Sequence, residues 1–107
     1  MMKPKLADEA FVKARLGELP GWGLEETKWI VKRYRFRAFL DGIAFVQEVA
    51  RIAEEANHHP LIAIDYKVVT LKLTTWSAGG LTELDLESAG RFDAAYAAVR
   101  GEAQEGE

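Results

Sequence analysis

The sequence contains no cysteine, which excludes disulfide scaffolds, thiolate metal sites and cysteine nucleophiles. No apolar run approaches the roughly 18 residues that a membrane-spanning helix needs. The first residues, Met1-Met2-Lys3-Pro4-Lys5, carry no apolar signal core, so we expect a cytoplasmic protein. Amide and sulfur side chains are scarce, while acidic residues number 17. This pattern suits a protein from a thermophile, a hypothesis that a melting midpoint would check.

The length of 107 residues, with 49% hydrophobic and 29% charged residues, predicts a single globular domain over residues 1–107. A chain this short buries a modest share of its surface, so oligomerisation is a reasonable further source of stability. The net charge of −3 argues against nucleic acid as the main partner, because phosphate binding usually needs a basic domain.

Hydrophobic periodicity predicts the order α-β-α-β-β-α. We expect helices at residues 7–19, 39–56 and 82–100 and strands at 27–37, 61–65 and 66–75, with room for a turn that splits the region 25–36 into two strands. Thr82 to Asp85 resembles a capping box with Asp in place of Glu, and Gly101 is expected to end the last helix. Residues 101–107 then form a mobile acidic tail. The order fits an α+β fold with helices on one face of an antiparallel sheet.

Three apolar or charged features each have a structural interpretation, and two of them have others as well. The row Arg33, Arg35 and Arg37 is either a site for anions or nucleic acid or a charged face that protects a sheet edge. Trp22 follows the Pro20-Gly21 turn and, without other information, is best read as a lid on the core. Segment 39–56 carries two apolar stripes, one of which can cover the sheet while the other meets a neighbouring helix, a second subunit or the monomer's own interior. The stripes are Phe39, Ile43, Val46, Ala50 and Ala53, and Phe45, Val49, Ile52 and Ala56.

The only two histidines, His58 and His59, are adjacent and follow a long predicted helix. Histidine exchanges protons near neutral pH, and the helix C-terminus favours imidazolium. Glu54 and Glu55 precede them by four residues each, so each carboxylate would orient one imidazole if the helix continued. The pair is therefore either a proton-transfer site or two ordinary last-turn residues. A metal site is less favoured, because Glu54 or Asp85 would have to complete the ligand set.

The run Glu54-x-x-x-His58-His59-Pro60, followed by Tyr66, Trp76 and Asp85, resembles the signature of the pterin-4a-carbinolamine dehydratases. The similarity extends to Pro20-Gly21-Trp22, to the strand from Ile30 to Phe36 and to Gly79-Gly80-Leu81-Thr82, so that it covers about residues 15–97. It implies a four-stranded antiparallel sheet with helices on one face, and a homodimer or homotetramer formed through helices.

The resemblance also implies an activity, namely dehydration of a 4a-hydroxytetrahydropterin to quinonoid dihydropterin without metal or organic cofactor. This reaction recycles the tetrahydrobiopterin used by aromatic amino acid hydroxylases. His58 would be the main proton-transfer residue and Glu54 would orient it, while His59 would bind and orient the pterin and exchange a second proton. The residues expected to contact the substrate are His58, His59, Pro60, Trp22, Thr75, Trp76, Ser77 and Ala78.

Two features leave a different function open. Many active members of the family carry a third histidine where this chain has Trp76, and indole is neither an acid nor a base near neutral pH. Asp85 has an ambiguous role, since it would cap a helix and shape the pocket only indirectly. The alternative is a weakly catalytic member that serves as a dimerisation, assembly or coactivator-like binding module.

Overall fold

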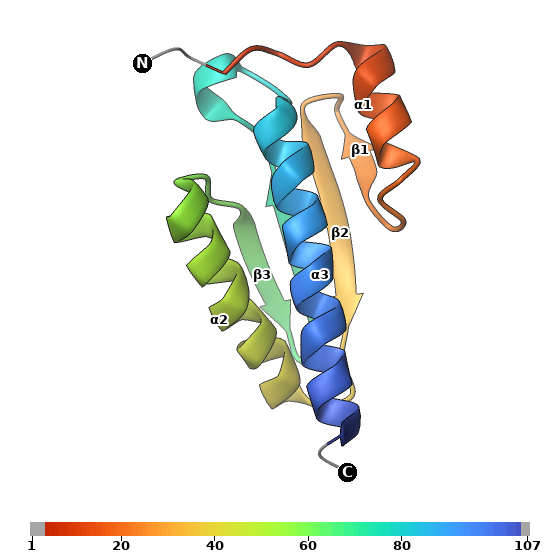
Figure 1. Ribbon diagram of the computed structural model, residues 1–107, viewed down its shortest axis with the longest axis vertical. Helices are drawn as coiled ribbons and strands as arrows, with labels where there is room; N and C mark the ends of the chain where they lie inside the picture. The colour runs from red at the N-terminus through yellow and green to blue at the C-terminus, as the bar shows by residue number, and fades with distance from the viewer. Residues whose placement is uncertain (1–3, 106–107) are drawn as a thin grey trace.

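The computed structural model describes residues 4–105, with side chains up to residue 101. Three α-helices and four strands follow one another along the chain (Figure 1). In chain order they are α1 (Glu9–Leu16), β1 (Gly23–Glu25), β2 (Trp29–Arg35), α2 (Phe39–Ala56), β3 (Leu61–Asp65), β4 (Val68–Leu73), the 3₁₀ turn η1 (Trp76–Ala78) and α3 (Glu83–Glu105).

The four strands form one antiparallel sheet in the order β1-β2-β4-β3. Helices α2 and α3 lie side by side on one face of this sheet, and they run in opposite directions (Figure 1). The predicted α+β architecture with helices on one face is therefore confirmed. Within residues 4–105, no helix combines the length and the apolar character needed to cross a bilayer.

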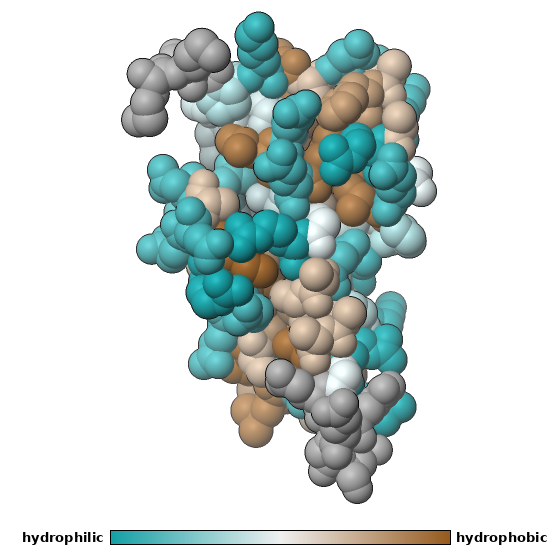
Figure 2. All heavy atoms as spheres, viewed as in Figure 1, coloured by the Kyte–Doolittle hydropathy of each residue, from teal (hydrophilic) through white to brown (hydrophobic). Residues whose placement is uncertain are grey.

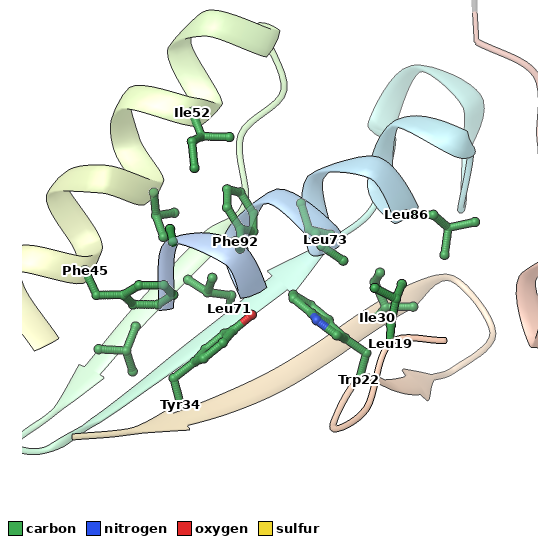
Figure 3. Close-up of a cluster of buried hydrophobic side chains, with 14 of the residues drawn as sticks. Leu19, Trp22, Ile30, Tyr34, Phe45, Ile52, Leu71, Leu73, Leu86 and Phe92 are labelled. Carbon is green, nitrogen blue, oxygen red and sulfur yellow. The ribbon is translucent and has the colours of Figure 1, made fainter. Parts of the chain in front are cut away.

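The core lies between the sheet and the two long helices (Figure 3). Side chains alternate across the sheet, so β2 directs Ile30 and Tyr34 inward, and β4 directs Val69, Leu71 and Leu73 inward. Helices α2 and α3 close this layer mainly with Phe45, Val49, Ile52, Leu86 and Phe92.

Helix α2 has the predicted bounds, and its two apolar stripes differ in their exposure. The stripe with Phe45, Val49 and Ile52 is buried in the core of the monomer. The other stripe begins exposed at Phe39, and the neighbouring Leu40 is 72% exposed. Figure 2 shows hydrophobic residues scattered among charged ones over this helix-bearing face. The exposed apolar start of α2 is available to a neighbour, whereas the core stripe is not.

Strand β3 is an edge of the sheet, and all five of its residues are exposed. Leu61 is 52% exposed, and Ile62 and Ile64 are about equally open at 39% and 40%. Because the outer side of this strand pairs with nothing within residues 4–105, its backbone is available for pairing with another chain.

The bounds of four predicted elements differ from those in the structure. Helix α1 begins later and ends earlier than the expected 7–19, and the Asp8 side chain caps its start by accepting from the Ala10 amide. The expected strand 27–37 is β2, and the turn for which the region 25–36 left room separates β2 from β1, with Glu26 and Thr27 at positive φ. The expected strand 66–75 is β4, which spans Val68–Leu73. Gly101 does not end α3, which continues to Glu105, so the expected tail is helical over that stretch. Residues 106–107 of that tail lie outside the described residues.

Candidate active site

The two histidines lie where α2 gives way to β3. Asn57 adopts the left-handed conformation with φ of 50°, and the His58 amide then donates to the Ala53 carbonyl at 3.0 Å. Pro60 follows and prevents any further helix. This turn removes His58 and His59 from the helical register, so the spacing of four residues from Glu54 and Glu55 no longer predicts their partners.

His58 is buried and is bound by a carboxylate from the other long helix. Its Nε2 lies 2.6 Å from Oδ1 of Asp85, and only 9% of His58 and none of Asp85 is exposed. The prediction that Glu54 orients His58 is wrong, because the left-handed turn points the imidazole toward the start of α3. Asp85 therefore contacts His58 directly, a stronger role than the indirect one expected from the sequence.

The second carboxylate oxygen of Asp85, Oδ2, caps the start of α3. Oδ2 accepts from the Thr82 amide at 2.9 Å and from the Thr75 hydroxyl at 2.8 Å. The Thr82 hydroxyl accepts from the Leu84 amide at 3.2 Å and lies 2.8 Å from the Thr75 hydroxyl. The predicted capping box is confirmed, and it shares its carboxylate with the histidine.

His59 lies in a different environment from His58. Its Nε2 is 2.5 Å from Oε2 of Glu54, and 53% of its side chain is exposed. Glu55, expected beside His59, is instead bound by Arg51 and by Arg91 of α3, each at 2.8 Å. The hydrogen bond from Arg91 is the main reason that the pKa of Glu55 lies below its usual value. Each histidine thus has one carboxylate partner, but neither partner is the one that helical spacing predicted.

The segment expected to contact substrate after β4 forms a tight turn. The Thr75 carbonyl accepts from the amides of Ala78 and Gly79, both at 3.0 Å, and this holds the exposed Ser77 at the surface. Trp76 is 74% exposed, and its ring meets Trp29 edge-on with centroids 5.2 Å apart. Thr75 connects this turn to His58 through Asp85, whereas Trp76 contacts the side of β2.

Trp22 is not at this site. It is 6% exposed, its ring meets the Tyr34 ring edge-on, and its Nε1 donates to Asp93 at 3.1 Å (Figure 3). Asp93 is eight residues beyond Asp85 on α3, about 12 Å farther along the helix axis. The expectation that Trp22 packs against a substrate ring is therefore wrong, and its other interpretation, a lid on the core, describes it.

The surface around the histidines is open. Half of the His59 side chain and most of Trp76 face solvent. A separate hollow of about 850 Å³ lies between the N-terminal segment and the start of α3, lined in part by Phe11, Thr82 and Glu83, and neither histidine is among its lining residues. Across the described part of the chain, no three His, Asp or Glu side chains are grouped so that they could hold a metal ion.

Sequence reasoning missed Thr82 as a member of this site. The signal was present, because an Asp at the third helical position reaches back to the N-cap residue. The sequence did not show that Asp85 caps α3 with one oxygen and binds His58, 27 residues earlier, with the other.

Comparison with known proteins adds the family. Residues 4–95 match the family model described as pterin 4 alpha carbinolamine dehydratase. A curated relative from Picosynechococcus sp., whose dehydratase name is provisional, is 42% identical over 92 residues, 86% of this chain and 98% of that protein.

Two solved structures are also similar. A protein from Brucella melitensis described as a transcriptional coactivator/pterin dehydratase superimposes with a TM-score of 0.82 at 29% identity, covering 86% of this chain and 99% of the other. A pterin dehydratase-like protein described as a RuBisCO assembly factor of the alpha-carboxysome has a TM-score of 0.61 at 26% identity, covering 71% and 89%. With the family model matched over nearly the whole domain, this chain belongs to the pterin-4a-carbinolamine dehydratase family.

Proposed function

We propose that this protein catalyses the loss of water from a 4a-hydroxytetrahydropterin to give a quinonoid dihydropterin. The observation that carries the proposal is a pair of adjacent imidazoles, each bound by its own carboxylate at the same helix end. Family membership supports the substrate class. The reaction would be one step in the recycling of a tetrahydrobiopterin-type cofactor after aromatic amino acid hydroxylation, and a separate two-electron reduction of the quinonoid product would complete it.

The chemistry needs one proton to be given and one to be taken. As the C4a–O bond breaks, the leaving oxygen receives a proton and departs as water, and the N5 proton is lost as the C4a=N5 double bond forms. We assign the first transfer to His58 and the second to His59, which also orients the pterin. A positioned acid or base contributes about 10²–10⁴-fold to such steps.

The other contacts follow from the open surface at this end of the molecule. Glu54 supports His59 rather than His58. Pro60 directs the chain into β3, and the turn formed by Thr75, Trp76, Ser77 and Ala78 offers an exposed indole and backbone groups to a flat ring. Trp76 supplies contact and water exclusion but no proton, so we expect modest turnover.

The test uses His58→Gln, because a glutamine amide can still donate to Asp85 while it cannot exchange a proton near neutral pH. The carbinolamine is generated in solution and its dehydration is followed by ultraviolet absorbance. The wild-type protein should exceed the buffer rate and the variant should lose at least about 100-fold of that excess. Equal rates for wild type, variant and buffer would refute the dehydratase proposal. Persistence of activity in a chelator would separately support a reaction without metal.

A binding module is the second candidate, and the exposed edge strand β3 favours it. Leu61, Ile62 and Ile64 present apolar side chains on an edge strand that pairs with β4 on one side only within residues 4–105. The similar RuBisCO assembly factor shows that a protein of this fold has been described in an assembly role. If the wild-type protein shows no activity in the dehydration assay but still self-associates, the binding module becomes the better interpretation of its function.

We also propose that the protein is a homodimer or homotetramer. The exposed start of α2 and the open edge of β3 are the two surfaces that support this. Leu61→Lys places a charge on the edge, on the face of the sheet opposite to the buried Leu71, so a β3 contact would be weakened. Light scattering of this variant beside the wild type measures the effect, and an unchanged mass would remove β3 from the interface.

A further inference from the structure

We propose that Asp85 is a positioning residue that fixes the tautomer of His58, so that His58 exchanges its proton at Nδ1. The inference rests on the proposed function only for its catalytic consequence. The tautomer itself is a property of the folded protein and can be measured without any substrate.

The proton positions around Asp85 follow from which groups can only donate. The Thr82 amide donates to Oδ2 because a backbone N–H has no other capacity, and the Thr75 hydroxyl also donates to Oδ2. Since the single Thr75 proton is used there, the hydroxyl of Thr82 donates to that of Thr75. Asp85 is thus an acceptor throughout this network.

Oδ1 is the remaining oxygen of the same carboxylate, and the only described donor facing it is His58 Nε2 at 2.6 Å. Because Oδ1 of Asp85 can only accept, Nε2 of His58 must carry the proton of this hydrogen bond. In the neutral ring this leaves the lone pair on Nδ1, and in the imidazolium form Nδ1 carries the second proton. Proton exchange with a substrate therefore occurs at Nδ1.

Nδ1 is also accessible. In the described part of the chain, every buried side-chain nitrogen or oxygen has a hydrogen-bond partner. His58 has one hydrogen bond, and it uses Nε2. Nδ1 is therefore not completely sealed from solvent, although only 9% of His58 is exposed.

The network predicts a specific failure for Asp85→Asn. The Thr82 amide needs an oxygen opposite it, so the asparagine oxygen takes the place of Oδ2 and its NH₂ group faces His58. Nε2 must then accept, and the ring proton moves to Nδ1. The imidazolium form, which would give its proton to the leaving oxygen, would place an Nε2–H group against the asparagine NH₂ group and is therefore disfavoured. A wrong tautomer of this kind lowers the turnover of serine proteases by about 10⁴-fold. We expect kcat to fall at least about 100-fold, with little change in KM because the residue does not contact substrate.

The experiment is a long-range ¹H–¹⁵N correlation spectrum of the imidazoles at alkaline pH, where the rings are neutral. The chain has only two histidines, so His59→Gln assigns both signals. The wild type should show His58 with its proton on Nε2, and Asp85→Asn should show it on Nδ1. Thr75→Val is the matched control, because it removes a donor to Oδ2 and leaves the contact between Oδ1 and His58, so its tautomer should equal that of the wild type.

A wild-type His58 with the proton on Nδ1, or with both tautomers populated, overturns the proposal even if Asp85→Asn does not fold. An Asp85→Asn protein that folds and retains the Nε2 proton also overturns it. If the tautomers are as expected and the wild type has no dehydratase activity, the proposed function fails alone and the positioning role stands.

Discussion

Asp93 of α3 is a partly buried acceptor that connects the sheet, the Trp22 turn and the last helix. Its Oδ1 accepts from the Trp22 indole at 3.1 Å, from Lys32 Nζ at 3.0 Å and from the Tyr34 hydroxyl at 2.5 Å. The side chains of Lys32 and Asp93 are 17% and 24% exposed, so solvent screens their attraction only in part. We predict that Asp93→Ala destabilises the protein strongly.

The expected loss follows from what the substitution leaves behind. The Tyr34 residue is 1% exposed, so its hydroxyl would be left buried without an acceptor, at a cost of about 1–3 kcal/mol. Lys32 would lose a partly buried partner, and breaking such a pair costs about 3–5 kcal/mol when it is fully buried. Allowing for the remaining exposure, we expect about 3–5 kcal/mol in total for Asp93→Ala. Asp93→Asn keeps an acceptor oxygen but loses the charge, so we expect about 1–3 kcal/mol.

The assay is urea unfolding followed by tryptophan fluorescence, with Asp65→Ala as the control. Asp65 is also an aspartate, but it is exposed at the end of β3, so its removal should change the free energy of unfolding by less than about 0.5 kcal/mol. A double-mutant cycle of Asp93→Ala with Tyr34→Phe should show coupling, because the two residues share a hydrogen bond. A loss below about 0.5 kcal/mol for Asp93→Ala would refute the argument that this oxygen connects the three elements.

Two further predictions concern other parts of the molecule. Val46 is half-buried on α2, so Val46→Glu should weaken oligomers in light scattering. Val49 is fully buried, so Val49→Glu should unfold the monomer. Equal effects of the two substitutions would contradict the assignment of the stripes. Burial, and next the bond to Asp93, raise the pKa of Tyr34 above its ordinary value of 10.0. As the pH rises, the unfolded chain therefore loses the Tyr34 hydroxyl proton before the folded protein does. The free energy of unfolding should be unaffected below about pH 10 and should fall above it by up to about 1.4 kcal/mol per pH unit. Tyr34→Phe should show a shallower fall.

The fold could be predicted from the sequence because its signals are local. The alternation of Ile30 and Tyr34 with the arginines predicts β2, and the apolar stripes with Pro60 beyond them predict α2 with its observed bounds. The capping box at Thr82 predicts where α3 begins. The end of α3 was missed because Gly101 is a common helix stop but is also tolerated within a helix at a modest cost.

The partners of the histidines could not be predicted in the same way. Spacing of four residues predicts contacts only while the helix continues, and Asn57 ends it in the left-handed conformation. The choice of Asp85 over Glu54 for His58 depends on how α3 packs beside α2, which is a long-range contact that local patterns do not contain. Trp22 was predicted as a substrate contact because it lies in the part of the sequence that resembles the family, whereas the core determines its position beside Asp93.

The arrangement of α2 and α3 gives a physical reason for the position of the site. The helices are antiparallel, so the C-terminus of α2 and the N-terminus of α3 meet at the same end of the molecule (Figure 1). The negative end of the α2 dipole favours a cationic imidazole, and the positive end of the α3 dipole favours a carboxylate. His58 and Asp85 are therefore each suited to their own helix end before they contact one another. The same carboxylate caps α3, so Asp85→Ala removes the cap and the histidine partner together, and an Asp85→Ala protein with lowered activity and wild-type stability would contradict this coupling of helix capping and histidine positioning.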